Sequence, residues 1–245
     1  MDRDNDDKSG VSLSLVVPLF NEREVVERLI ERIDRFTSQL ELPFEVILVD
    51  DGSSDGTAAC VAEKIRNRSG YRLLRLKRNY GQSTAIWAGF EAARGEIIAT
   101  IDGDLQNEPC DLLLMLPLLK ECDCVVGVRV ERQDNLLRRL SGKLANWVRR
   151  KICKDPFRDT GCGVRVFRRR CLQHLFPFNG IHRWLPVLLQ MMGYEVREIP
   201  VRHFPRPGGS SKYGVLNRLW RGLVDLAGVS WMKRRAIRYE IKKEE

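Results

Sequence analysis

Short apolar runs alternate with longer amphipathic stretches along the first half of the chain. The apolar runs lie at residues 12–17, 44–50, 71–76, 96–102 and 122–128. The amphipathic stretches lie between them, at residues 21–36, 55–68, 81–94 and 109–121. In the first stretch, Val25, Leu29 and Ile33 have the spacing of one helical face. Strands that alternate with helices of about ten to fifteen residues predict an α/β fold, with a mostly parallel sheet flanked by helices.

Polar and acidic residues gather where the expected strands end. The segments LFNE, DDGSSDGT, KRNYGQ and DGDLQ follow Pro18, Val49, Leu76 and Ile101. Open α/β sheets bind their ligands outside the carboxyl ends of the strands. The sequence therefore predicts a binding site at this edge of the sheet.

Asp50 and Asp51 stand side by side at the end of the second expected strand. A turn at Asp51-Gly52 and a helix cap at Asp55 or Ser54 explain the loop that follows, but not the two neighbouring charges. Adjacent carboxylates repel each other unless a ligand or a hydrogen-bond donor uses them. We interpret the pair as acceptors for the N–H groups of a nucleotide base and the hydroxyls of its ribose.

Asp102 and Asp104 close the fourth expected strand, with Gly103 between them to allow a bend. Their carboxylates and the amide oxygen of Gln106 form half of a hard-oxygen shell that Mg²⁺ or Mn²⁺ accepts, with water and phosphate oxygens for the rest. The alternative is an Asx-turn with solvated aspartates. The position at a strand end favours the metal site, where the cation would neutralise the charge that grows on a departing diphosphate.

Composition narrows the range of partners. The chain has 245 residues, a formal net charge of +9 and 43% hydrophobic residues, enough for one large domain with a small appendage. The positive charge favours a polyanionic partner, which means nucleic acid, an anionic membrane or phosphorylated substrates. We find no nucleic-acid-binding motif with stacking aromatics. The seven cysteines form no CxxC pair, so we expect reduced core thiols of a cytosolic protein and no zinc site.

Six motifs in order resemble one protein family. The segments VVPLFNE, VDDGSSDGT, RNYGQSTAIWAGF and IDGDLQNEP are similar to those of family-2 glycosyltransferases with the GT-A (Rossmann-like) fold. DTGCGVRVFRR and RPGGSSKYG resemble the branch that contains dolichol-phosphate mannose synthase and undecaprenyl-phosphate glycosyltransferases. The resemblance covers about residues 11–215. It implies transfer of a sugar from a nucleotide-sugar donor to a polyprenyl phosphate, with inversion at the anomeric carbon.

The resemblance also implies roles for individual residues. The positions that match the nucleotide-sugar site are Pro18, Phe20, Glu22, Asp50, Asp51, Asp102, Gly103, Asp104, Arg206 and Lys212. Arg206 and Lys212 match positions that contact the donor phosphates, in a Gly-rich loop suited to closing over the ligand. The metal ligands would be Asp102, Asp104 and Gln106.

The acceptor explains why no general base stands out. A phosphomonoester has a second pKa of about 6 and attacks as a dianion, without a base. By resemblance, Arg129 and one of Arg138 and Arg139 hold the acceptor phosphate. Asp159 matches an aspartate near the transfer site; the alternative is a buried turn carboxylate paired with Arg165. We expect His182 to be a structural hydrogen bonder and not a catalyst.

Two segments raise the question of a membrane. Residues 135–153 and 215–243 carry apolar stripes flanked by Arg and Trp, as interfacial helices do, although packing on the protein's own sheet gives the same pattern. No run of about 18 apolar residues occurs. We expect peripheral binding on the cytoplasmic face of a membrane, completion by a separate membrane protein, or a truncated chain.

These patterns divide the chain into three parts and leave two other functions open. We expect a disordered tail at 1–10 with no signal peptide, a GT-A domain at 11–213, and a basic amphipathic C-terminal helix at 214–245. One alternative is a family-2 transferase that acts on a saccharide or another hydroxyl acceptor, which would need a base. The other is a non-catalytic basic scaffold or nucleic-acid-binding protein. The donor sugar and its base stay open.

Overall fold

The structure, a computed structural model, describes residues 10–130, 146–206 and 215–237, and for residues 215–221 the backbone alone. The tail expected at 1–10 therefore lies almost wholly outside the described residues. All seven cysteines are free thiols, five of them buried and two half-buried, which agrees with the core role predicted for them.

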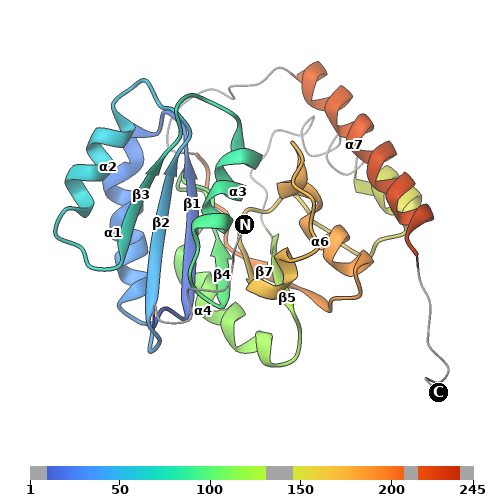
Figure 1. The fold of residues 1–245 in the computed structure, drawn as a ribbon, viewed down its shortest axis with the longest axis horizontal. Coiled ribbons are helices and arrows are strands. Elements are labelled where there is room, and N and C mark those ends of the chain that lie inside the picture. The colour runs from blue at the N-terminus through green and yellow to red at the C-terminus, as the bar shows by residue number, and fades with distance from the viewer. Residues whose placement is uncertain (1–9, 131–145, 207–214, 238–245) are drawn as a thin grey trace.

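One seven-stranded sheet forms the centre of the fold (Figure 1). Its strands are β1 (Leu13–Leu19), β2 (Phe44–Asp50), β3 (Tyr71–Arg75), β4 (Ile97–Thr100), β5 (Cys124–Arg129), β6 (Arg165–Arg168) and β7 (Val196–Val201). They lie in the order β3-β2-β1-β4-β6-β5-β7. Strand β6 is antiparallel to β4 and β5, and the other neighbouring pairs are parallel. The mostly parallel α/β sheet predicted from the sequence is confirmed.

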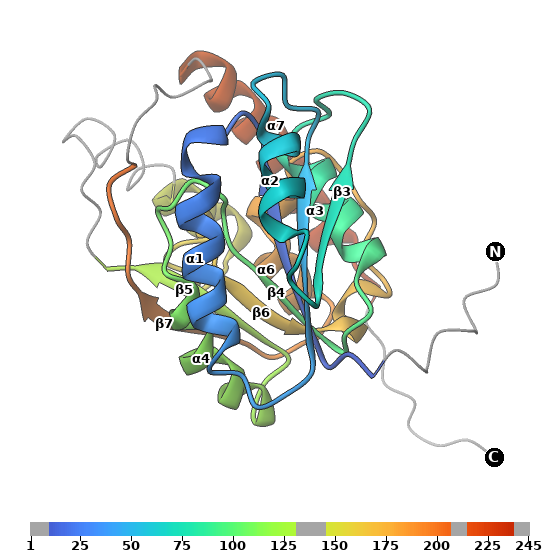
Figure 2. The same ribbon diagram turned by 90° about the vertical axis from the view of Figure 1, so that its left-hand side faces the viewer.

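Helices cover both faces of this sheet. They are α1 (Val26–Thr37), α2 (Thr57–Ile65), α3 (Gln82–Ala92), α4 (Leu112–Met115), α6 (Ile181–Met191) and α7 (Val215–Arg235). Figure 2 shows α1 and α3 on opposite sides of the strands. Alternate strand residues belong to two hydrophobic cores, one on each face of the sheet. Leu15 and Leu48 pack with α1, whereas Val16 and Ile47 pack with α3 and α6. The continuous apolar runs in the sequence arise because both faces of each strand are buried.

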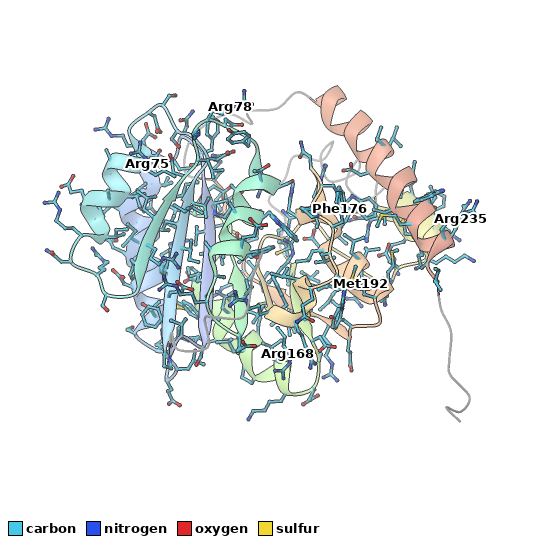
Figure 3. The ribbon with its side chains drawn as sticks, viewed as in Figure 1. Arg75, Arg78, Arg168, Phe176, Met192 and Arg235 are labelled. Carbon is cyan, nitrogen blue, oxygen red and sulfur yellow. The ribbon has the colours of Figure 1, made fainter. Side chains whose placement is uncertain are left out.

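The reversed direction of β6 brings its preceding loop to the carboxyl edge of the other strands. Figure 3 shows Arg78, which follows β3, and Arg168, which ends β6, at opposite edges of the sheet. Residues 159–164 therefore return to the edge at which β1, β2 and β4 end. This is the edge predicted to carry the site.

The segment 109–121 differs from its expected form. In place of one helix it forms the 3₁₀ turn Pro109–Asp111, the short helix α4 and the 3₁₀ turn Leu116–Lys120. Pro117 lacks the amide hydrogen that a continuous helix would need at this position, so the helix stays short.

Helix α7 is 21 residues long and lies beside the part of the fold that is built from residues 146–191 (Figure 1). Its bounds fall within the helix predicted for 214–245, whose last residues lie outside the described part. Among the residues that the structure describes, no helix has the length and apolar character needed to cross a membrane.

Gly89 lets α3 approach the sheet closely, and this contact gives a test of the fold. A Cβ atom at Gly89 would overlap Cγ1 of Val16 in β1. We predict that Gly89→Val lowers the free energy of unfolding by about 2 kcal/mol, because the packed core must move apart. Urea unfolding followed by circular dichroism measures this change. Gly228→Ala in α7, where nothing lies near the added atom, is the control and should not destabilise; equal losses in both variants would contradict the packing.

Candidate active site

The loops after β1 and β2 are joined into one unit at the carboxyl edge. The amide of Asn21 donates to Ser53 Oγ at 2.9 Å, and the amide of Ser54 donates back to Asn21 Oδ1 at 2.9 Å. Asp55 accepts the amide of Thr57 at 2.9 Å, although the N-cap position of α2 is Gly56. Asp55 therefore accepts an amide at the start of α2, as a capping residue does, although it lies one residue before the N-cap position. These bonds fix the backbone that borders the site.

Asp50 and Asp51 are both buried, but their surroundings differ. Asp51 accepts the amides of Tyr80 and Gly81 at 2.8 Å each, so it holds the loop that precedes α3. Burial raises the pKa of Asp51 despite these two amide hydrogen bonds. Asp50 accepts only the amide of Ser53 at 3.3 Å through Oδ2, and within the described residues its Oδ1 has no hydrogen-bond partner. Asp50 is thus the member of the pair with an acceptor left for a ligand.

Asp102 lies at the end of β4 under close control from its neighbours. Its Oδ1 accepts the side-chain amide of Gln82, the first residue of α3, at 2.9 Å. Its carboxylate lies directly over Gly163, where any Cβ atom would overlap it. Burial, together with the charge of Asp104, raises the pKa of Asp102 to about 6, while Arg165 and Arg129 act in the opposite direction. A carboxylate that is costly to ionise is one that a cation would stabilise.

Asp104 and Gln106 complete the loop after β4. Asp104 Oδ1 accepts the amide of Gln106 at 3.2 Å, which is the Asx-turn considered from the sequence. Leu105 between them has a positive φ of 63°, and Arg32 of α1 donates to its carbonyl at 3.1 Å. The side-chain amide of Gln106 donates to the carbonyl of Phe204 at 3.3 Å, so the amide oxygen is the atom left for a ligand. Residues with a strained backbone conformation that neighbouring contacts hold in place are common at preorganised functional sites.

The donor set here fits a divalent cation that also takes ligand oxygens. In the part of the chain that the structure describes, no group of three or more His, Cys, Asp or Glu side chains surrounds one point. The protein offers the two carboxylates of Asp102 and Asp104, whose charges act on each other. Mg²⁺ and Mn²⁺ sites with one or two carboxylates completed by substrate phosphates and water have this composition. The metal roles of Asp102, Asp104 and Gln106 stay predictions.

Gly103 has a packing role between these two acids. A Cβ atom on Gly103 would overlap Leu19 Cδ2 and approach the carbonyl oxygen of Pro18 to 2.8 Å. The loop after β4 can therefore lie against the end of β1 only with glycine here. Pro18 and Phe20, also predicted for the nucleotide-sugar site, are the neighbouring half-buried residues of β1 and its loop.

Arg129 and Asp159 form a bidentate ion pair at the same edge of the sheet, next to β5 and β6. Nε and Nη2 of Arg129 donate to the two carboxylate oxygens of Asp159 at 2.6 Å and 2.8 Å. Arg129 ends β5 and Asp159 lies in the loop before β6. Arg165, the partner considered as an alternative, donates to the carbonyl of Thr160 at 3.1 Å and interacts with Asp159 through its charge. The structure thus places Arg129 and Asp159 together, as one unit near Asp102.

Other predicted residues fall in different places. Arg206 forms an ion pair with Glu22, which joins two predicted donor-site residues 184 positions apart. Lys212, Arg138 and Arg139 lie outside the described residues. Nδ1 of His182 lies 2.7 Å from Ser83 Oγ, and burial, with Arg165 and Arg183, lowers its pKa to about 3. His182 is therefore a neutral structural hydrogen bonder, as expected.

Two residues at the site are not among the site residues predicted from the sequence. Gln82 contacts Asp102, and Arg165 is a buried guanidinium whose charge acts on the same carboxylate. The amphipathic stretch that begins at Gly81 could have indicated Gln82, since a side chain at the N-terminus of a helix reaches the same edge as the strand ends. The sequence suggested Arg165 only as a partner of Asp159.

Comparison with known proteins assigns the chain a family. A model of the family described as glycosyl transferase family 2 matches residues 14–176. The chain is 38% identical over 237 residues to dodecaprenyl-phosphate galacturonate synthase of Rhizobium johnstonii, which covers 94% of the chain and 70% of that protein. It is 37% identical over 207 residues to undecaprenyl-phosphate 4-deoxy-4-formamido-L-arabinose transferase of Pectobacterium carotovorum, which covers 84% of the chain and 63% of that protein. The chain therefore spans about two thirds of the length of these relatives.

Solved structures with low sequence identity share the fold. Glucosyl-3-phosphoglycerate synthase from Mycobacterium tuberculosis superposes with a TM-score of 0.64 at 20% identity, over 92% of this chain and 81% of that one. A mannosyltransferase from Pyrobaculum calidifontis, solved in complex with GDP-Man and Mn²⁺, superposes with a TM-score of 0.62 at 20% identity, over 93% of this chain and 65% of that one. These neighbours support the GT-A fold expected from the motifs.

The Arg129–Asp159 pair gives a stability test of the site. The side chains are 17% and 8% exposed, so Asp159→Asn would leave the Arg129 guanidinium buried without its counter-charge. We predict that this variant loses about 3 kcal/mol of unfolding free energy in urea titrations at pH 7. Glu27→Gln, which removes the exposed pair with Lys64, is the matched control and should change stability far less. Equal effects of the two substitutions would show that Asp159 carries no special charge interaction.

Proposed function

Because the chain belongs to glycosyl transferase family 2, we propose that it transfers a sugar from a nucleotide-sugar donor to the phosphate of a polyprenyl lipid, with inversion at the anomeric carbon. The observation that carries the proposal is the shared edge at which Asp102 and Asp104 lie near the guanidinium of Arg129. Acids suited to a cation and a fixed cation suited to a phosphate stand together there. The names of the two relatives, both polyprenyl-phosphate enzymes, support the acceptor class.

The donor would lie across the loops after β1, β2 and β4. Asp50 has a buried acceptor atom, Oδ1, which suits an N–H group of the nucleotide base. Asp51 is already occupied by two backbone amides, so we assign it to shaping the base pocket. In this proposal Arg206, which forms an ion pair with Glu22, contacts the donor phosphates. Lys212 keeps its expected role beside these phosphates.

Asp102, Asp104 and Gln106 would hold the cation, Mg²⁺ or Mn²⁺, together with the diphosphate. When bound, such a cation supplies Lewis-acid neutralisation of the charge on the leaving nucleoside diphosphate. Gln82 donates to Oδ1 of Asp102 at 2.9 Å, and Oδ2 lies over Gly163, so both neighbours fix the orientation of this carboxylate. The raised pKa of Asp102, about 6, also means that a proton competes with the cation for this carboxylate at acidic pH.

The acceptor phosphate would meet Arg129. Asp159 accepts from Nε and Nη2 of Arg129, and a guanidinium carries five N–H donors, so further donors remain for a phosphate. Asp159 then acts as a positioning residue that locks the guanidinium plane. Arg138 or Arg139 would supply a second cation. Since the phosphate dianion is itself the nucleophile, the residues only align the two phosphates and screen their repulsion.

A hydroxyl acceptor fits these residues less well. Such an acceptor needs a base at its hydroxyl, and both carboxylate oxygens of Asp159 already accept from Arg129. His182 is half-buried, with Nδ1 at 2.7 Å from Ser83 Oγ. The charge-neutralising cluster suits a nucleophile that arrives ionised.

We further propose that the protein acts as a peripheral protein on the cytoplasmic face of a membrane, where it meets its lipid acceptor, alone or with a separate membrane protein. The support is the acceptor class together with the basic net charge of +9. Sedimentation of the protein with vesicles tests this part separately from catalysis.

Transfer assays test the main proposal. Purified protein is incubated with labelled UDP- or GDP-sugars, Mn²⁺, and either a polyprenyl phosphate or a saccharide acceptor. We expect label in the lipid phase only, and we expect Asp104→Ala to lower the rate by about 100-fold or more, because Lewis-acid stabilisation contributes several kcal/mol. Glu63→Gln, an exposed acid on α2, is the control and should keep full activity.

Two outcomes would contradict the proposal. Label that appears on the saccharide and not on the lipid would favour a hydroxyl acceptor. Full activity of Asp104→Ala would exclude the metal role of this residue, and salt-sensitive RNA binding without any nucleotide-sugar binding would favour a basic binding protein instead.

A further inference from the structure

A basic hollow lies at the part of the fold where residues 146–158 meet the end of α7. Its volume is about 550 Å³, and its lining residues are Asn146, Trp147, Arg150, Lys151, Lys154, Asp155 and Arg158. In Figure 1 this segment begins as the short yellow helix beside the lower end of α7. Lys233 of α7 donates to the carbonyls of Cys153 and Lys154, so α7 and the wall of the hollow are in direct contact.

Four of the seven lining residues are cations, and all four side chains are exposed. Arg150, Lys151, Lys154 and Arg158 are these residues. Among the residues described, none of them forms an ion pair. Exposed cations that face one another across a hollow repel, which costs stability unless an anion lies between them. The arrangement therefore favours an anionic ligand.

Asp155, the one acid in the lining, is already neutralised by a buried arginine. Arg149, buried beneath the surface, donates to Asp155 Oδ1 at 2.5 Å and to the carbonyl of Phe157 at 2.6 Å. The amide of Phe157 also donates to Asp155 at 3.1 Å. These bonds fix the floor of the hollow and cancel its negative charge. The four outer cations keep their full effect on the space in front of them.

A tryptophan side chain lies beside the cations. Trp147, which lines the hollow, is 59% exposed. Large aromatic side chains in water are unfavourable, but an indole is stable at the level of lipid headgroups, where one end is apolar and the other is wet. A free phosphate ion would neutralise the cations and leave the Trp147 ring in water.

We propose that this hollow binds the phosphate-bearing headgroup of an anionic phospholipid at a bilayer surface, with Trp147 inserted beside it. None of its lining residues is among those assigned to the donor or the acceptor, and the lipid proposed here is a ligand and not a substrate. The inference rests on the proposed function only in that a lipid acceptor requires the protein to reach a membrane. Headgroup binding would hold the acceptor side of the molecule against the bilayer.

Vesicle flotation tests the proposal with the full chain and no sugar donor. Vesicles of phosphatidylcholine with about 30% of the anionic lipid phosphatidylglycerol are compared with pure phosphatidylcholine vesicles. We expect binding to the anionic vesicles that weakens as salt screens the charges. Arg150→Gln with Lys151→Gln should lower the partition coefficient by about 30-fold, from about 1 kcal/mol per basic residue. Glutamine keeps the helical propensity of these positions.

Matched variants and competitors decide the outcome. Arg66→Gln with Lys120→Gln removes two exposed cations elsewhere and should change binding far less than the hollow variant. Trp147→Ala should weaken binding to anionic vesicles at constant charge. Equal losses in the two double variants would overturn the proposal, as would binding of inorganic phosphate together with no preference for anionic over pure phosphatidylcholine vesicles. Preferential binding of an RNA oligonucleotide in place of vesicles would also overturn it.

A separate readout keeps this test apart from the proposed function. Transfer to a short, water-soluble prenyl phosphate in detergent should be the same in the hollow variant and the unsubstituted chain. If neither transfers sugar while the vesicle results hold, the proposed function fails and the headgroup site stands. If both transfer sugar and the hollow variant binds vesicles normally, the headgroup site fails alone.

Discussion

Asp102 and Asp104 stand one residue apart where β4 ends, and neither burial nor their mutual repulsion favours two negative charges there. Burial and Asp104 raise the pKa of Asp102 to about 6. The surrounding structure compensates with fixed donors and cations: the amide of Gln82, the buried guanidinium of Arg165, and Arg129. These groups do not fully neutralise the two carboxylates, and a divalent cation would neutralise the remaining negative charge.

The first turn of α3 ties the parts of the site together. Gly81, its N-cap, contacts Asp51 at the end of β2, Gln82 contacts Asp102 of the acidic pair, and Ser83 contacts His182 of α6. Arg183 of α6 in turn pairs with Asp225 of α7 at 2.8 Å. Hydrogen bonds thus run from α7 through α6 to the first turn of α3 and Asp102.

The sequence predicts some features of this site and not others, for physical reasons. Asp102 and Asp104 are visible because a buried apolar run ends on them. The pairing of Arg129 with Asp159 is not, because it spans 30 residues and depends on the reversed strand β6. Strand β6 has four residues, and β7 is mostly half-buried, so neither produces a clear apolar run. Gln82 carries no pattern of its own, and its role follows only from where α3 begins.

The central claim is that the acidic pair after β4 is a cation site poised near neutral pH. Titration of the protein with Mn²⁺ from pH 8 to pH 5, followed by the electron paramagnetic resonance of free Mn²⁺, measures it directly. Asp102 must lose its proton to bind, so we predict constant affinity above its pKa of about 6 and a loss of about tenfold per pH unit below it. Affinity that stays constant down to pH 5, or that survives Asp102→Asn unchanged, would contradict the account.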